Sequence, residues 1–205
     1  MIDVPEAGLV HPPSAHRHSH DDERPYLERI ERDRASKDAV FQTSPDSPLS
    51  PGSRRDFKGL SYFEVDEAYR LAGLRLAPYL GDQPVSFEIP TSDGRMRAAR
   101  RAGTFGFVLA GIACSLTAYD LSDGEANMLF VPFLDATSGH ETYGAGRYLD
   151  VEPGADGRYV LDFNIAYHPL CVYSDIYSCP LTPAENRLSL RIEAGERLLT
   201  DEAAR

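Results

Sequence analysis

The sequence predicts a mainly β fold: a single antiparallel β barrel or sandwich preceded by one N-terminal helix. Three observations lead to this prediction. From about residue 57 onward, the chain divides into eight or nine short segments with the composition of strands. Turn signals such as SDG, AG and PGADG separate several of these segments. Before residue 57, one stretch has the apolar spacing of a helix.

Residues 1–24 are rich in Pro, His, Asp and Ser and show no apolar period. Such a segment buries too little apolar surface to offset the entropy of ordering it, so we expect a disordered tail. Its histidines are also a compositional signal for metal capture, although a disordered tail is the favoured interpretation. They are His11, His16, His18 and His20.

Residues 25–56 are predicted to form one surface helix followed by a loop. Pro25 suits a first helical position, and Leu27, Ile30 and Phe41 lie on an approximate helical face. The stretch TSPDSPLSPGSR at 43–54 contains three prolines with Ser, Asp and Gly, which opposes both a helix and a strand ladder. The β domain is then expected to cover 57–200.

The candidate strands within 57–200 alternate or cluster apolar residues over five to nine positions. They are 69–77, 85–89, 95–101, 104–110, 112–120, 127–133, 146–151, 158–164 and 187–193. Short strands at this spacing are typical of antiparallel barrels and sandwiches.

Composition restricts the partners and the compartment. The formal net charge of −11 opposes binding to phosphate backbones, so we expect no nucleic-acid partner and no binding to anionic membrane surfaces. The N-terminus lacks the features of a signal peptide, and the longest near-apolar run, 105–114, is too short to span a bilayer as a helix. A cytoplasmic protein with three reduced cysteines is therefore expected, and the oligomeric state is not readable.

The polar stretch DATSGHETYGAGRYLD at 135–150 marks a candidate site. If 146–164 were one hairpin, Arg147 would face Asp162, with Asn164 on the same surface. Arg147 would then bind a carboxylate or phosphate of a ligand, or form a structural ion pair with Asp162. Glu141 lies nearby as a candidate general base.

The second half of the chain resembles a known family. LFVPFLDATSGHETYGAGRYLDV and LDFNIAYHPLCVYSDIYSCPLTPAENRLSLRIEAGE, with SPDSPL and FKGLSYFEVDEAYRL upstream, are similar to the short form of the uncharacterised bacterial and archaeal family known as domain of unknown function 1684. The resemblance covers roughly 25–196 and implies a shared fold, but no activity. It also implies a fixed set of polar residues: Asp135, Thr137, Glu141, Tyr143, Arg147, Asp162, Asn164, Tyr167, Cys171, Cys179, Glu185 and Asn186.

The cysteine pair leaves several interpretations open. Cys171 and Cys179 are spaced unlike a zinc knuckle, so no metal site is predicted. A buried thiol pair is favoured, and it forms a bridge if the loop brings the two residues close. Cys171 would act as a nucleophile only with a group such as His168 beside it. Glu185 is a second carboxylate of the site, an acceptor of backbone N–H bonds or a partner of Arg187.

We therefore predict a protein that binds a small polar or anionic ligand, without a cofactor, in a pocket formed by loops 134–146 and 165–186. The predicted ligand-binding residues are Arg147, Tyr143, Asn164, Tyr167, Asp135 and Asn186. One alternative is a small-molecule hydrolase, with Glu141 or Asp162 as the base and Glu185 as a further catalytic candidate. The other is a non-catalytic interaction domain in which the polar motif only fixes loops.

Overall fold

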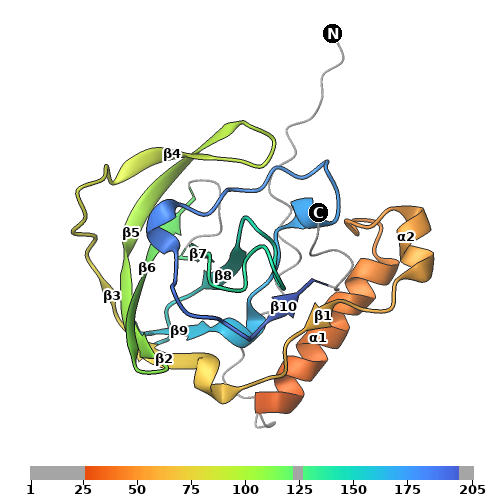
Figure 1. The fold of residues 1–205 in the computed structure, drawn as a ribbon, viewed down its shortest axis with the longest axis horizontal. Coiled ribbons are helices and arrows are strands. Elements are labelled where there is room, and N and C mark those ends of the chain that lie inside the picture. The colour runs from red at the N-terminus through yellow and green to blue at the C-terminus, as the bar shows by residue number, and fades with distance from the viewer. Residues whose placement is uncertain (1–25, 122–126, 199–205) are drawn as a thin grey trace.

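A curved antiparallel sheet forms the centre of the computed structural model, which describes residues 26–121 and 127–198 (Figure 1). Its strands follow the order β3-β5-β6-β7-β8. Strand β4 also pairs with β5, along the first part of β5, whereas β3 pairs further along it. The strands are β3 (Leu76–Ala77), β4 (Ser86–Pro90), β5 (Met96–Leu109), β6 (Ile112–Asp120), β7 (Leu129–Phe133) and β8 (Arg147–Val151).

Two small antiparallel sheets complete the β structure. In one, β1 (Ser61–Tyr62) pairs with β10 (Glu196–Arg197), and in the other, β2 (Arg70–Leu74) pairs with β9 (Tyr159–Asp162). Short 3₁₀ turns connect these elements: η1 (Glu67–Tyr69), η2 (Phe163–Ile165), η3 (Leu170–Val172) and η4 (Ala184–Asn186). The prediction of a mainly β fold with one N-terminal helix is confirmed. Within the described residues the main sheet stays open, so it is not a closed barrel.

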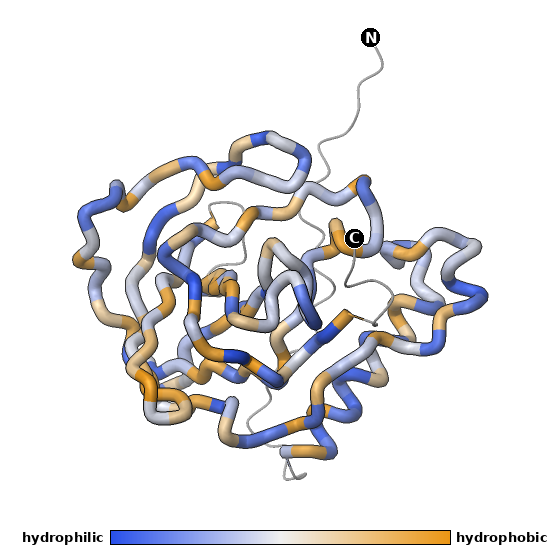
Figure 2. Tube along the Cα trace, in the orientation of Figure 1, coloured by the Kyte–Doolittle hydropathy of each residue, from blue (hydrophilic) through white to orange (hydrophobic). Residues whose placement is uncertain are grey.

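Helix α1 (Tyr26–Thr43) lies against β1 and β10, away from β4 and β5 (Figure 1). It is hydrophilic along most of its length (Figure 2), and its buried residues are Ile30 and Phe41. The prediction that 43–54 lacks helix is wrong at one point, because Pro51–Asp56 forms the short helix α2. Pro51 begins this helix, where its missing N–H is harmless, and the Ser50 side chain accepts from the backbone N–H of Ser53.

Several strand boundaries differ from the prediction. The segments 95–101 and 104–110 form the single long strand β5, with a bulge between Arg101 and Gly103. The segment 187–193 is not a regular strand. It is held instead by isolated bonds, such as the Leu188 N–H to the Leu134 carbonyl and the Ile192 N–H to the Asp135 side chain.

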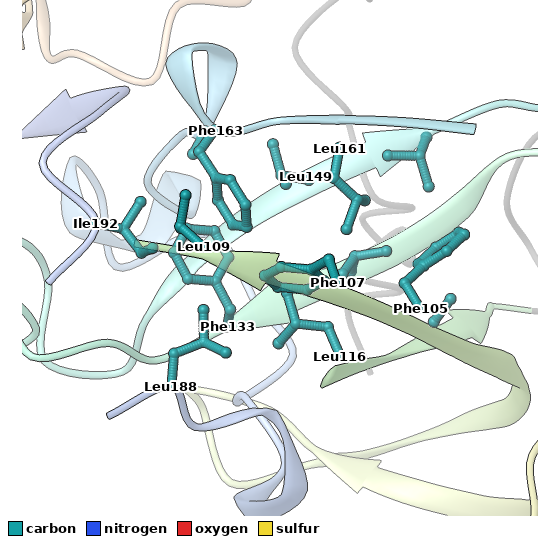
Figure 3. Packing of buried hydrophobic residues seen from close by; sticks show 14 of the residues in the cluster. Phe105, Phe107, Leu109, Leu116, Phe133, Leu149, Leu161, Phe163, Leu188 and Ile192 are labelled. Atoms are coloured by element: carbon teal, nitrogen blue, oxygen red, sulfur yellow. The ribbon is translucent and has the colours of Figure 1, made fainter. Parts of the chain in front are cut away.

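The largest hydrophobic cluster lies on one face of the main sheet (Figure 3). Phe105 and Leu116 from β5 and β6 pack with Phe133 from β7, and Phe163 from η2 contacts Phe133 edge-on. Leu188 and Ile192 of the C-terminal segment cover this cluster. Burial of such large side chains stabilises the fold by about 1.5–3 kcal/mol each.

The predicted hairpin at 146–164 is wrong. Strand β8 pairs with β7, which places Arg147 opposite Phe133, and β9 pairs with β2, which places Asp162 opposite Arg70. All five residues of β7 are buried, and so are four of the five in β8. Pairing these two apolar strands buries more surface than pairing β8 with β9, where Val160 stays partly exposed.

Candidate functional site

The loop between β7 and β8 is folded around the carboxylate of Asp135. This buried side chain accepts from the backbone and hydroxyl of Thr137 and from the backbone N–H of Ile192. The Thr137 carbonyl in turn accepts from the N–H groups of residues 140–142. The polar stretch at 135–150 therefore begins as a compact, internally bonded loop.

Arg147 is fully buried and fixes the C-terminal segment. Its Nη2 donates to the Ile192 carbonyl at 2.7 Å and lies 3.5 Å from Asp135 Oδ1, while Nη1 donates to the Glu196 carbonyl at 3.1 Å and to the Ala194 carbonyl. Its charge is compensated by Asp135, not by Asp162 as the predicted register required. Burial lowers the pKa of Arg147, and Asp135 opposes that shift.

Glycine is required just before this arginine. Gly146 has φ +104°, and a Cβ at this position would lie 2.5 Å from the Phe133 carbonyl oxygen and 2.5 Å from Thr182 Oγ1. Any other residue would strain the backbone and collide with two neighbours. The close approach lets β8 begin directly beside β7, which places Arg147 inside the molecule.

The Asn186 side chain forms hydrogen bonds between β6 and β7 where the two strands do not bond each other directly. The only register pair between β6 and β7 is Tyr119↔Phe130, and continuing it places Thr117 opposite Pro132, which has no N–H. The Asn186 Nδ2 donates to the Thr117 and Pro132 carbonyls at 2.8 and 2.7 Å, and its Oδ1 accepts from the Thr117 N–H at 2.8 Å. One buried amide thus replaces the missing ladder bonds.

Asp162 and Asn164 attach the N-terminal elements to the β structure. Asp162 accepts from the Tyr26 hydroxyl of α1 at 2.8 Å and lies 3.8 Å from Arg70 Nε. Asn164 exchanges two hydrogen bonds with the backbone of Asp66. Both side chains are buried, and the contacts they make are within the protein.

A buried charged cluster joins α1 to β10. The Glu196 carboxylate accepts from Lys37 Nζ of α1, from the His168 backbone N–H at 2.7 Å and from the Tyr173 hydroxyl at 3.3 Å. Burial opposes the charge on Glu196, but Lys37 and His168 outweigh it, so its pKa lies below the usual value. Burial lowers the pKa of His168 to about 4, so this imidazole is neutral at pH 7.

His168 is not positioned as a base for Cys171. Its Nε2 accepts from the Tyr143 backbone N–H at 3.3 Å, and its Nδ1 lies 3.6 Å from Glu196 Oε2. The imidazole therefore connects the loop 134–146 to the buried cluster. Activation of Cys171 therefore depends on other groups.

Those other groups form what we call the thiol corner: Ser92, Tyr143, Cys171 and Cys179. The Cys171 backbone N–H donates to Cys179 Sγ at 3.4 Å. Two backbone contacts hold Cys179 against the turn between β4 and β5, since its N–H donates to Ser92 Oγ at 3.0 Å and its carbonyl accepts from the Ser92 N–H at 2.8 Å. Cys179 is buried, whereas Cys171 is half-buried, and both are free thiols.

The thiol corner favours a thiolate at Cys171. Hydrogen bonding from Cys179, and then from Ser92 and Tyr143, lowers the pKa of Cys171 to about 7 against the opposing effect of burial. The same Cys171–Cys179 contact, with burial, raises the pKa of Cys179. Of the two sulfurs, Cys171 is therefore the one that ionises more readily, and Cys179 is the one that stays protonated.

The remaining predicted residues lie apart from the thiol corner. Glu141 is paired with Arg191 at 2.6 Å on the surface. Glu185 accepts from Arg101 at 2.7 Å and from the Tyr119 hydroxyl at 2.9 Å, and not from Arg187 as one interpretation had it. Tyr167 donates its hydroxyl to Asp150.

A groove of about 550 Å³ lies elsewhere, beside β3 and the start of β9. It is lined by Arg75, Leu76, Asp156, Gly157, Arg158 and Tyr159. None of the predicted ligand-binding residues is among them. Over the described ranges 26–121 and 127–198, no cluster of three or more His, Cys, Asp or Glu side chains is arranged to hold a metal ion, and no helix is long and apolar enough to cross a membrane. The four tail histidines lie outside these ranges.

These features define a mainly β protein in which buried polar side chains fix long irregular segments. The chain belongs to the family described as protein of unknown function (DUF1684), whose model matches residues 55–197. It is similar to an uncharacterised protein of Haloarcula marismortui solved by solution NMR, with 40% sequence identity and a TM-score of 0.61. That match covers 83% of this chain and 93% of the Haloarcula chain. No curated protein matches.

Sequence reasoning missed Lys37, Glu196 and Ser92. Lys37 is one of two lysines in the chain, which is a weak signal for a special position. Glu196 ends the RIEAGE stretch, where nothing local indicates that it is buried. Ser92 lies in the turn signal SDG, which indicates a turn and not a contact with a thiol. Contacts between residues 159 positions apart, as between Lys37 and Glu196, leave no local pattern to read.

Proposed function

We propose that the chain binds a small polar ligand at the thiol corner, between loops 134–146 and 165–186, and that Tyr143 and Cys171 contact it. The observation that carries the proposal is the convergence of polar side chains from three separate segments at a partly exposed sulfur. The buried contacts of Asp135, Arg147 and His168 hold the walls of this corner in place. A preorganised polar group on a rigid frame is what a specific small-molecule site needs.

The charge at the corner favours an uncharged or electrophilic ligand over an anion. The positive charge of Arg147 is compensated by Asp135, and its N–H groups donate to three backbone carbonyls. A thiolate at Cys171 would repel a carboxylate or phosphate. A polar molecule that presents a hydrogen-bond donor or an electrophilic centre to the sulfur fits both features.

A second candidate function is the interaction domain. It is favoured by one observation: Asp135, Arg147, Asn164 and Asn186 make their contacts with the backbone and with each other. Such residues fix loops without contacting any ligand. A hydrolase with Glu141 or Asp162 as base has less support, because both carboxylates are engaged in ion pairs.

The test is a thermal-shift panel on the full chain, using neutral amides and polyols, small aldehydes, dicarboxylates and phosphate esters. We expect a neutral or electrophilic class to raise Tm in the wild type and to lose that effect in Tyr143→Phe and Cys171→Ser. His140→Ala, an exposed change on the same loop, is the matched control and should respond like the wild type. Stabilisation that persists in both corner variants, or a panel with no stabilising class, contradicts the proposal.

A further inference from the structure

We propose that Cys171 and Cys179 are an oxidation site for hydroperoxides, in which Cys171 reacts first and Cys179 closes a reversible disulfide. This inference concerns covalent chemistry of the chain itself and does not depend on a ligand bound at the thiol corner. It accounts for why a half-buried sulfur lies directly beside a second, buried one.

The geometry brings the two cysteines into direct contact. Cys179 Sγ already accepts from the Cys171 backbone N–H at 3.4 Å, so this sulfur lies against the residue with which it would form the bridge. Cys179 is fixed to Ser92 by two backbone contacts, and Cys171 lies in η3 directly after Pro169 and Leu170. Closure therefore joins two cysteines that are already in contact.

The two sulfurs differ in the way that such a reaction requires. Cys171 is partly exposed, and its thiolate is favoured by Cys179, Ser92 and Tyr143. Cys179 is 4% exposed, and its pKa is raised mainly by the contact with Cys171. Cys171 is therefore the sulfur that reacts with the oxidant, and Cys179 is the protected thiol next to it.

The proposed reaction is balanced with hydrogen peroxide as the oxidant. The Cys171 thiolate attacks one peroxide oxygen, an S–O bond forms, the O–O bond breaks, and the departing hydroxide takes a proton to give water. The Cys179 sulfur then attacks Cys171 Sγ, an S–S bond forms, and the hydroxyl of the sulfenic acid leaves with the Cys179 proton as a second water. Two thiols are oxidised, and one peroxide is reduced to two waters.

Cys114 provides an internal control. It is partly exposed on β6, its thiol faces the Ile112 carbonyl at 3.5 Å, and burial raises its pKa. At pH 7 a thiol with a pKa of about 7 is half ionised, whereas a thiol whose pKa is raised above the ordinary value is almost wholly protonated. Allowing for the weaker nucleophilicity of the more acidic thiol, we expect Cys171 to react with peroxide about tenfold faster than Cys114.

The experiment treats the full, reduced chain with hydrogen peroxide at pH 7, then caps the remaining thiols with N-ethylmaleimide and maps the peptides without reduction. We expect a Cys171–Cys179 link that dithiothreitol reverses, with Cys114 capped. In Cys179→Ser, dimedone should trap a sulfenic acid on Cys171. In Cys171→Ser, Cys179 should remain an unoxidised thiol, which N-ethylmaleimide caps once the protein is denatured. Circular dichroism checks that both variants fold.

Three outcomes would overturn the inference. One is loss of the Cys114 thiol at the same rate as Cys171, which would indicate unselective oxidation. Another is overoxidation of Cys171 in the wild type while Cys179 remains a free thiol. The third is the absence of a dimedone adduct on Cys171 in a folded Cys179→Ser protein. Each result can be read whether or not any compound of the thermal-shift panel binds.

Discussion

Replacement of Arg147 by methionine tests whether the buried polar motif holds the fold. Methionine keeps most of the length of the side chain and removes the charge. The substitution leaves Asp135 buried without its cation, and it leaves the carbonyls of Ile192, Ala194 and Glu196 without their guanidinium donor. Breaking a buried ion pair by removing one partner costs about 3–5 kcal/mol. Because a single guanidinium makes all these contacts, their energies do not add, and we expect a loss of about 4 kcal/mol.

That loss is a large part of the total for a protein whose free energy of unfolding is about 5–15 kcal/mol. The assay is urea unfolding followed by circular dichroism, with the midpoint and slope compared between wild type and variant. Arg191→Ala is the matched control, since Arg191 makes a close pair with Glu141 on the same loop but is 45% exposed. It should cost less than about 1 kcal/mol. If Arg147→Met lowers the free energy of unfolding no more than Arg191→Ala does, the conclusion that Arg147 fixes the C-terminal segment is wrong.

Three further outcomes follow from buried contacts. Asn186→Ala should lower the free energy of unfolding by about 3 kcal/mol in urea titrations, because it orphans polar backbone groups of Thr117 and Pro132; an unchanged midpoint would refute the bridging role. Tyr26→Phe removes the hydroxyl that binds Asp162 and should cost about 1–2 kcal/mol and speed hydrogen exchange in α1, whereas unchanged exchange would contradict the docking contact. His168 has a pKa of about 4 when folded, below its unfolded value of 6.5, so the unfolded state binds the proton first as pH falls. Stability should therefore decline between pH 6.5 and 4, and His168→Gln should reduce that decline by about 2–3 kcal/mol; an identical pH profile for the variant would count against a buried neutral imidazole.

The strand content and the N-terminal helix could be predicted because both leave local periodic patterns. The strands β5 and β6 alternate over a long apolar stretch, and Ile30 and Phe41 mark the buried face of α1. Strand pairing could not be predicted in the same way. The register of β8 was assigned to its neighbour in sequence, but β7 offers a wholly buried partner, and that tertiary preference decides the pairing.

Tyr143 and Cys171 could be singled out from the sequence, because polar and thiol side chains in Gly-rich and Pro-rich segments stand out. A role for them in a ligand site stays a prediction. Sequence reasoning also grouped Arg147 with Asp162, which the structure separates. A buried arginine that binds backbone carbonyls looks the same in a sequence as an arginine that binds a ligand. Only the tertiary contacts of Ile192 and Asp135 distinguish the two.

The most direct test of the central claim, that the buried motif organises a reactive thiol corner, is site-resolved alkylation of the native protein by iodoacetamide. Mass spectrometry would follow each cysteine as a function of pH. We predict that Cys171 reacts with a midpoint near pH 7, that Cys179 stays protected, and that Cys114 reacts with a midpoint above the ordinary thiol pKa, because burial raises its pKa. Equal profiles for Cys171 and Cys114, or a Cys171 midpoint at the ordinary thiol value that Tyr143→Phe leaves unchanged, would contradict this account.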